Sequence, residues 1–466
     1  MTTSLGPGSE IDGFRLGELL HTGSMAAIYR LTGPDGPLPL IMKIPRLGPA
    51  ERAINVIAFE VCRMVLGALA QSPHHPTLVA FGDVETMPYL VMEYVEGTRL
   101  DDRVPHAPLP PDEVARLGSA LALGLHEIHR QGALHLDLKP TNVLYRPSGE
   151  AVLIDFGLAR HGHYPDLLEE EFRTPIGNWV YLAPEQIVGV RCDPRSDIFA
   201  LGAILYHLAT GRFPFGKPSR MAELRRRLYR DPLPPRALGA ETPGWLQEII
   251  LHCLEVDARD RYASAAAVAF DLANPAQVAI TERGLRDRRT GAATLFRRWL
   301  EARKFEPAPC PPVAVPTQPA PIVLVAIAPG PPDESTFAAL RDAARRVTEV
   351  DHACRVACVT VVPPAVGLSG ERYEETPTGR HIAQLVNLRR FARPLELPEE
   401  RLTYHVLESD KPAAALIDYA KMNEVDQILL GAPRSGRPMR LLTGVAAQVV
   451  AEAQCTVSVV RPRPQQ

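Results

Sequence analysis

The sequence lacks the features that mark membrane and exported proteins. Its longest apolar stretches, such as DIFALGAILYHLA at 197–209, fall well short of the roughly 20 residues that a membrane-spanning helix needs. The start, MTTSLGPGSE, has no basic segment followed by an apolar run, so we expect no signal peptide. These absences predict a soluble, cytoplasmic chain with no transmembrane segment.

The chain also lacks a charge excess and any metal-type cysteine spacing. Its 51 Lys and Arg nearly balance 54 Asp and Glu, which argues against a nucleic-acid-binding protein. Seven cysteines are scattered without CxxC or Cys/His spacing, so we expect reduced thiols. Cys354 and Cys358 would lie about 13 Å apart on one face of a predicted strand, too far for a disulfide. We expect both thiols to be buried.

Proline, by contrast, is abundant and divides the chain. Residues 306–321, EPAPCPPVAVPTQPAP, are too rich in Pro for a packed element and indicate an extended linker. A chain of 466 residues is also expected to hold two or three cores. We place one domain at 11–275 and another at 321–463, with 276–320 between them.

The Arg-rich stretch 281–304 precedes the proline segment and predicts a basic amphipathic helix. Its apolar residues recur at helical spacing: Leu295, Phe296, Trp299 and Leu300. Such a helix can rest on an anionic membrane, but more often it docks on its neighbouring domain. We expect docking.

The first domain changes character near residue 111. Before this point the pattern indicates short strands, such as FRLGELL, AAIYRL and LPLIMKIP, around one helix at 51–70. Beyond it, apolar residues recur at steps of three and four, which predicts one helix face formed by Val114, Leu117, Leu121, Leu125 and Ile128. A small strand-rich lobe therefore precedes a larger helical lobe, and MEYVEG at 92–97 joins them.

Charged residues follow in an order that suits phosphoryl transfer, which needs positioning and charge neutralisation more than covalent chemistry. Lys43 ends an apolar strand, and Glu60 on the next helix is expected to pair with it and orient it. In HLDLKPTN, Asp137 is the expected base, Lys139 would steady the transferred group and Asn142 would hold a metal ion.

Two tripeptides extend this series. DFG begins at Asp155, directly after the strand AVLI, and its carboxylate is the expected second metal ligand. APE ends at Glu185, which Arg261 in the later stretch RDRY is expected to pair with, and Asp197 begins a buried helix. Each tripeptide alone is a weak signal, but their order and spacing together are specific.

These motifs resemble the eukaryotic-like (Hanks-type) Ser/Thr protein kinases over residues 11–275. The resemblance implies a bilobal α+β kinase fold, ATP and Mg²⁺ as cofactors, and a protein substrate. It also implies contacts with the bound nucleotide, which we assign to Gly23, Ile28, Lys43, Glu60, Met92, Glu93, Val95, Asn142 and Asp155.

The sequence departs from the kinase pattern in its loops. The phosphate-covering stretch HTGSMAAI at 21–28 keeps only Gly23 of the usual glycines, which loosens the expected grip on ATP. Leu136 stands where an Arg usually meets a phosphate on the activation segment, so a phosphate on Thr174 would lack that partner. Asn178 replaces a Thr that usually bonds the catalytic Asp and Lys, so preference for Ser and Thr would rest on Lys139.

The second domain alternates strands and helices. Five apolar strands with crossover helices predict a doubly wound parallel sheet with helices on both faces. Its ending, 427–462, resembles the universal stress protein family, and the resemblance covers about 140 residues. Gly431 and Gly444 fit that family's phosphate loop, whereas Arg434 and Val445 depart from it. Ala328 also stands where an Asp commonly ends the first strand. We expect a sensor or dimerisation module that does not bind ATP.

The sequence therefore predicts a bacterial-type Ser/Thr protein kinase with a regulatory universal-stress-type domain that acts in stress signalling. A homodimer through that domain is a further hypothesis. The alternative is a pseudokinase scaffold that acts through protein contacts. The thin glycine loop favours the alternative, and the full set of charged residues favours the enzyme.

Overall fold

The computed structural model describes most of both domains. The described residues are 5–23, 25–32, 39–46, 53–82, 87–162, 164, 166–168, 175–238, 241–310, 321–330, 333–352, 354–363, 377–398, 401–423, 425–432 and 444–462. Among these residues, no helix has the length and apolar character that a bilayer crossing requires.

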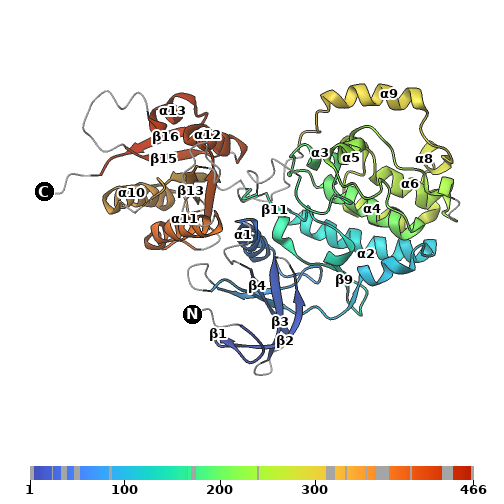
Figure 1. Cartoon of the computed structure of the whole chain (residues 1–466), viewed down its shortest axis with the longest axis horizontal. Helices are drawn as coiled ribbons and strands as arrows, with labels where there is room; N and C mark the ends of the chain where they lie inside the picture. Colours follow the sequence, from blue (N-terminus) through green and yellow to red (C-terminus); the bar gives the residue numbers. More distant parts are fainter. Residues whose placement is uncertain are drawn as a thin grey trace.

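The chain begins with a curled antiparallel sheet in the order β1-β2-β3-β4-β6-β5. One face buries Leu16, Tyr29, Met42 and Val91. Helix α1 (Ala53–Ala68) packs between this sheet and the rest of the chain (Figure 1). The strands are β1 (Glu10–Ile11), β2 (Phe14–Thr22), β3 (Ala26–Thr32), β4 (Leu40–Pro45), β5 (Leu78–Phe81) and β6 (Leu90–Glu93).

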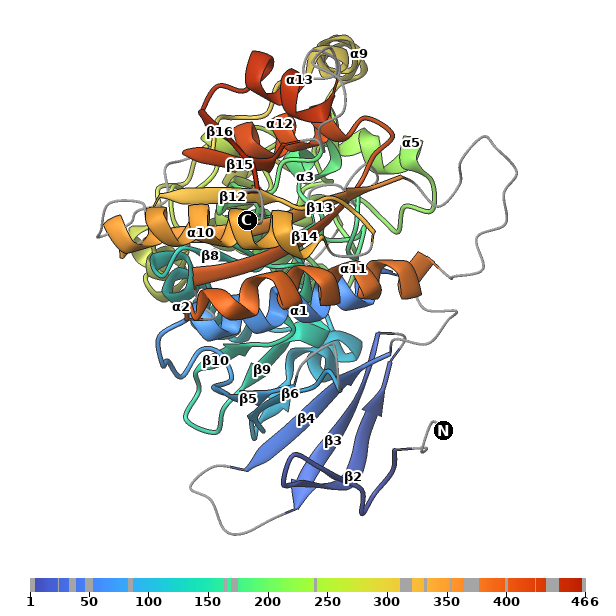
Figure 2. The ribbon, with the colours of Figure 1, turned by 90° about the vertical axis from the view of Figure 1, so that its left-hand side faces the viewer.

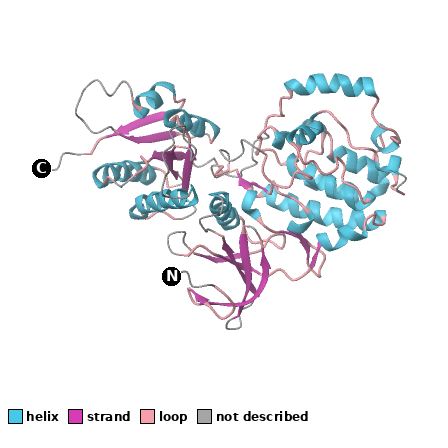
Figure 3. Ribbon diagram, in the orientation of Figure 1, coloured by secondary structure: helices cyan, strands magenta, loops and turns pink. Residues whose placement is uncertain are grey.

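A helical lobe follows, as the change of pattern predicted, and Figure 3 shows its helices in cyan. Helix α2 (Pro111–Arg130) buries the whole predicted face from Val114 to Ile128. Helix α4 (Arg195–Thr210) is buried on nearly every side, because α2 and α6 (Gly244–Cys253) pack against it. Shorter elements complete the lobe: β7 (Thr98–Arg99), β8 (Ala133–Leu134), β9 (Val143–Tyr145), β10 (Ala151–Leu153), β11 (Arg160–His161), α3 (Pro184–Ile187), α5 (Met221–Leu224), α7 (Ala265–Ala273) and α8 (Glu282–Leu285).

The basic amphipathic helix forms, but its apolar face does not dock as expected. Helix α9 (Ala292–Glu301) is anchored by Arg298, whose Nη1 lies 2.7 Å from Asp231 Oδ1. Phe296 is 62% exposed and Trp299 38% exposed. The two rings stack on each other at 5.9 Å, so aromatic self-contact replaces docking on the described part of the lobe. Periodicity identified the helix but could not identify its partner.

The second domain is the predicted parallel sheet, in the order β14-β13-β12-β15-β16. Adjacent residues of β12 face opposite sides: Val323 packs with α10 and α11, and Leu324 packs with α12 and α13 (Figure 2). Helices therefore cover both faces. The elements are β12 (Ile322–Ala326), α10 (Glu334–Val350), β13 (Arg355–Val362), α11 (Pro377–Ala392), β14 (Leu402–Glu408), α12 (Pro412–Met422), β15 (Gln427–Gly431), α13 (Val445–Glu452) and β16 (Thr456–Val460).

The cysteines only partly match expectation. Cys354 and Cys358 are buried free thiols, as predicted. Cys192 and Cys310, however, form a disulfide with their Cα atoms 5.6 Å apart, which corrects the expectation that all thiols are reduced. Their separation of 118 residues gave no sequence signal, because the fold alone brings the proline-rich segment to the loop after α3.

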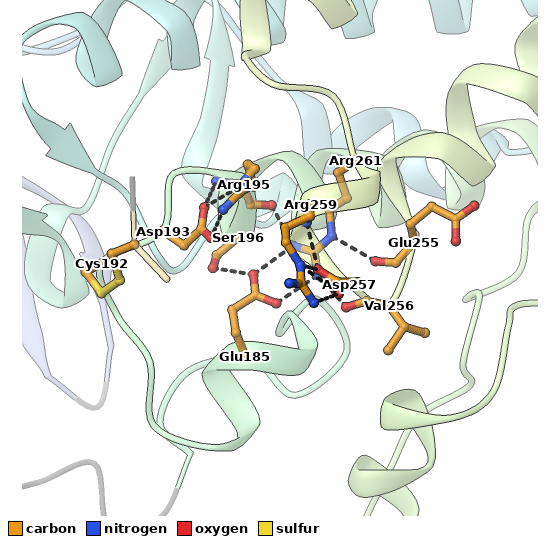
Figure 4. A network of polar contacts seen from close by, with 11 residues as sticks. Glu185, Cys192, Asp193, Arg195, Ser196, Glu255, Val256, Asp257, Arg259 and Arg261 are labelled. Carbon is orange, nitrogen blue, oxygen red and sulfur yellow. Dashed lines mark hydrogen bonds and ion pairs between the residues drawn. A yellow bond between two sulfur atoms is a disulfide. The ribbon is translucent and has the colours of Figure 1, made fainter. Parts of the chain in front are cut away.

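A buried ion pair fixes the base of the helical lobe, as the sequence predicted. Arg261 grips Glu185 with two parallel bonds, Nη1 to Oε1 at 2.7 Å and Nη2 to Oε2 at 2.8 Å (Figure 4). Ser196 Oγ donates to the same carboxylate at 2.6 Å. Burial raises the pKa of Glu185, but the charge and hydrogen bonds of Arg261, together with the hydrogen bond from Ser196, outweigh burial and lower that pKa.

Replacing Arg261 by Ala should cost about 3–5 kcal/mol in the free energy of unfolding, because it leaves the Glu185 carboxylate buried without its partner. The matched control is Arg259→Ala, which breaks an exposed pair with Asp257 and should cost less than about 1 kcal/mol. Thermal and denaturant unfolding of both variants measures the contrast. Equal losses would contradict this assignment of the buried pair.

Candidate active site

The HLDLKPTN loop brings three predicted site residues together. Asp137 Oδ2 accepts a hydrogen bond from Lys139 Nζ at 2.5 Å and from Asn142 Nδ2 at 3.3 Å. Asp137 Oδ1 accepts from the backbone N–H of Asn178 at 3.3 Å. The backbone N–H of Asn178 thus donates to Asp137 where a Thr hydroxyl was expected. This contact depends on the path of the backbone, so no sequence signal indicated it.

The Asp197 side chain fixes the backbone of this loop through hydrogen bonds. Its carboxylate accepts the N–H groups of His135 at 2.9 Å and Leu136 at 2.8 Å, and His129 Nε2 lies 2.8 Å from it. Leu136 has φ 59°, a left-handed conformation that costs free energy in a residue with a side chain. Burial would raise the pKa of Asp197, but its bond to His129 and the nearby His135 lower it. A charged, buried carboxylate therefore stabilises the strained loop.

Leu136 itself serves packing. Its side chain is buried, and its carbonyl accepts a bond from Gln186 Nε2 at 3.1 Å. The loop is thus fixed on both sides without a guanidinium at this position. Thr174, the residue that such a guanidinium would serve when phosphorylated, lies outside the described residues.

Phe156 sets the direction of Asp155. Its ring is fully buried and packs on His135 with the centroids 5.2 Å apart. Asp155 has φ 66°, which turns its carboxylate toward the sheet of the small lobe. There Asp155 Oδ1 lies 2.7 Å from Lys43 Nζ.

The two charges shift each other's pKa. The Lys43 ammonium lowers the pKa of Asp155 to about 2, against the opposing effect of burial. Burial lowers the pKa of Lys43, but the charge and hydrogen bond of Asp155, together with the nearby Cys62, outweigh burial and raise that pKa. Both groups are therefore charged at neutral pH.

The expected pair between Lys43 and Glu60 is not formed in this structure. Glu60 Oε1 lies 2.6 Å from Arg389 Nη2, and its Oε2 lies 3.2 Å from Arg63 Nε. Lys43 pairs with Asp155 instead. The sequence could not reveal this exchange, because Arg389 comes from the second domain and lies 329 residues away along the chain.

The other predicted nucleotide contacts line the small lobe and its join. Gly23 closes the β2–β3 turn and donates its N–H to Ala26 at 2.9 Å, and Ile28 pairs with Lys43 across β3 and β4. Met92 and Val95 are buried. The Glu93 side chain bonds Arg146 at 2.6 Å, so its carboxylate serves the fold. These positions thus belong to the small-lobe sheet and to the segment directly after it.

A small pocket lies beside the loop. It is lined by Asp137, Asn178, Tyr181, Leu182 and Gln186, among others. These residues come from the HLDLKPTN loop and from the stretch on either side of APE. Asp137 therefore lines a pocket to which the described residues of the glycine turn do not contribute.

The site can supply two oxygen ligands to a metal ion. Asn142 uses its amide nitrogen on Asp137, which leaves its amide oxygen available, and the Asp155 side chain is 42% exposed. Among the described residues, no group of three or more His, Cys, Asp or Glu could hold a metal ion. One carboxylate and one amide fit an ion such as Mg²⁺ that completes its shell with phosphate oxygens and water.

The phosphate loop expected in the second domain is only partly described. Gly431 ends β15 and Gly444 caps α13, as the pattern placed them. Val445 is 40% exposed and Ala328 is exposed after β12, while Arg434 lies outside the described residues. Neither Val445 nor Ala328 offers a polar side chain for a phosphate.

Comparison with known families agrees with both folds. Residues 60–272 match the family model for the protein kinase domain, and residues 321–461 match that of the universal stress protein family. The chain thus carries a protein kinase domain followed by a universal stress protein family domain.

The chain is similar to curated bacterial serine/threonine-protein kinases. The chain is 30% identical over 280 residues to the serine/threonine-protein kinase PknB of Mycobacterium tuberculosis, covering 58% of this chain and 44% of that protein. It is 33% identical over 276 residues to Pkn1 of Myxococcus xanthus, covering 57% and 36%. The chain therefore spans less than half the length of these relatives. The crystal structure of the M. tuberculosis PknI kinase domain aligns at 22% identity with TM-score 0.45, covering 59% of this chain and all (100%) of that one.

Asp197→Asn should loosen the catalytic loop, because a neutral amide gives weaker hydrogen bonds than a carboxylate to the N–H groups of His135 and Leu136. A loss of about 1.5–3 kcal/mol corresponds to amide exchange roughly 10–150-fold faster in the loop. Hydrogen–deuterium exchange of peptides spanning 133–142 measures it. Asp257→Asn, which removes a similar bond to a distant backbone N–H, is the control and should leave that peptide unchanged.

Proposed function

We propose that this chain is an ATP- and Mg²⁺-dependent protein serine/threonine kinase. The observation that carries the proposal is the convergence of Lys139 and Asn142 on the Asp137 carboxylate, with Lys43 and Asp155 beside them. Phosphoryl transfer requires this combination of base, cations and metal ligands. The kinase relatives support the same class.

Each residue has a defined part in the transfer. Asp137 takes the proton of the acceptor hydroxyl, whose oxygen bonds the γ-phosphorus as the bond to the leaving ADP oxygen breaks. Lys139 offsets the charge on the transferred group, and Lys43 meets the nucleotide phosphates. Asn142 and Asp155 would hold Mg²⁺, which when bound neutralises the phosphate oxygens. Gly23, Ile28, Met92, Glu93 and Val95 border the nucleotide.

The remaining proposals concern the domain boundaries, the substrate, the cellular location and the role of the second domain. We propose functional boundaries at 11–275 and 321–463, a protein substrate, and action in the cytoplasm, where ATP is available. The second domain would regulate the kinase in stress signalling without binding ATP, and a homodimer through that domain is a further proposal. The polar groups lost at Ala328 and Val445 support a domain that does not bind ATP.

The second candidate is a pseudokinase scaffold. It is favoured by the glycine turn, which retains Gly23 alone, and by the absence of the Lys43–Glu60 pair. The retained Asp137, Asn142 and Asp155 favour the enzyme, because a scaffold needs none of them.

Purified full-length protein should label itself or a generic basic protein with radioactive phosphate from ATP and Mg²⁺. Lys43→Met, Asp137→Asn and Asp155→Ala should each lower the rate by at least about a hundredfold, because each removes a group that acts on the transfer. Arg259→Ala, an exposed substitution far from the loop, is the matched control. A folded wild-type protein that binds ATP but transfers no phosphate would establish the scaffold instead.

A further inference from the structure

The second domain reaches the kinase domain at helix α1. Figures 1 and 2 both show α11 running beside α1. Arg389 of α11 places Nη2 2.6 Å from Glu60 Oε1, and its guanidinium also lies 5.4 Å from the Tyr404 ring of its own domain. Glu60 is only 5% exposed. The contact is therefore a buried ion pair with a pre-positioned arginine.

A second set of contacts falls on the segment that follows DFG. The backbone N–H of Asp166 donates to Asn423 Oδ1 at 3.0 Å, where Asn423 closes helix α12. The Arg355 guanidinium lies 4.8 Å from the Tyr164 ring. Asp166 and Asn423 are both buried. The docking surface thus covers the two parts of a kinase domain whose positions control its activity.

In this docked arrangement the charges of the site do not pair as phosphoryl transfer requires. Both Glu60 oxygens are engaged, one by Arg389 and one by Arg63. Lys43 pairs with Asp155, so the cation meant for phosphates and the carboxylate meant for metal neutralise each other. Phosphoryl transfer needs the lysine paired with the glutamate of this helix and the aspartate on the metal. The docked arrangement provides neither.

We propose that the universal stress protein family domain is an intramolecular inhibitor, which docks on α1 and the segment after DFG and holds Glu60 away from Lys43 through Arg389. On release, Glu60 exchanges Arg389 for Lys43, and Asp155 exchanges Lys43 for the metal. The proposal rests on the kinase function proposed above and deepens it by naming the regulatory contact.

The exchange is readily reversible only if each buried charge keeps a partner in both the docked and the released state. A carboxylate buried as Glu60 is strongly disfavoured without a cation. The docked state supplies Arg389 as that cation, and the released state supplies Lys43. A ligand or variant that weakens docking therefore shifts the equilibrium toward release without leaving the Glu60 carboxylate unpaired. Couplings between sites typically amount to 1–3 kcal/mol, or about 5–150-fold in an equilibrium.

The experiment compares full-length variants of α11 in the phosphate-transfer assay. Arg389→Ala should raise the initial rate about tenfold, and Arg389→Glu should raise it at least as much because it repels Glu60. Asn423→Ala removes the second contact independently and should also raise the rate. The control is Arg390→Ala: this neighbouring side chain is exposed, and its carbonyl bond to Arg341 survives the substitution.

Hydrogen–deuterium exchange of the α1 peptide at 53–68 reports docking without relying on activity. It should quicken in Arg389→Ala and Arg389→Glu and stay unchanged in Arg390→Ala. An Asp137→Asn version of each protein gives the background of the transfer assay.

Three results would overturn the proposal, and they differ from one another. Unchanged exchange in both Arg389 variants means that the domain does not dock through this residue. If hydrogen exchange quickens but the transfer rate does not rise, while the wild-type protein is active, the domain docks without inhibiting. The proposed kinase function would then stand, and the proposed inhibition would fail. If no variant exceeds the Asp137→Asn background, the proposed kinase function itself fails and inhibition fails with it.

Discussion

The catalytic loop depends on one buried carboxylate. Asp197 receives two backbone N–H groups from a stretch that includes Leu136 in a left-handed conformation, which the loop would not keep unaided. Its position comes from α4, a helix buried on nearly all sides, and the Glu185–Arg261 pair fixes the start of that helix through Ser196. The geometry around Asp137 is thus carried by the core of the large lobe and needs no phosphate on the activation segment to hold Leu136.

In the small lobe, the pairing of charges depends on competition between cations for the Glu60 carboxylate. Lys43 and Arg389 are both suited to Glu60, and Lys43 has a second choice in Asp155. Packing fixes the large lobe, whereas the pairing in the small lobe depends on which surface of α1 is covered. This division places the rigid catalytic loop in the large lobe and the exchangeable charge pairs in the small lobe.

Much of this fold could be predicted from sequence because its signals are local. The α2 face, the two lobes, the five-stranded parallel sheet and the Glu185–Arg261 pair followed from periodicity and from motifs in a fixed order. What failed depends on contacts between distant segments. The partner of Glu60, the Cys192–Cys310 bond and the exposed aromatic residues of α9 are set by tertiary placement, for which a single sequence carries no period or spacing.

The Cys192–Cys310 disulfide has a consequence for how far the second domain can travel. With the disulfide closed, the linker to the second domain runs from Cys310 to β12 and comprises residues 311–321. A linker of this length spans at most about 40 Å when fully extended. An undocked domain would therefore stay within a small volume, at an effective concentration in the millimolar range. Reduction of the disulfide would lengthen the linker and lower the effective concentration of the second domain near α1. The redox state of this one bond would therefore set how quickly docking is restored.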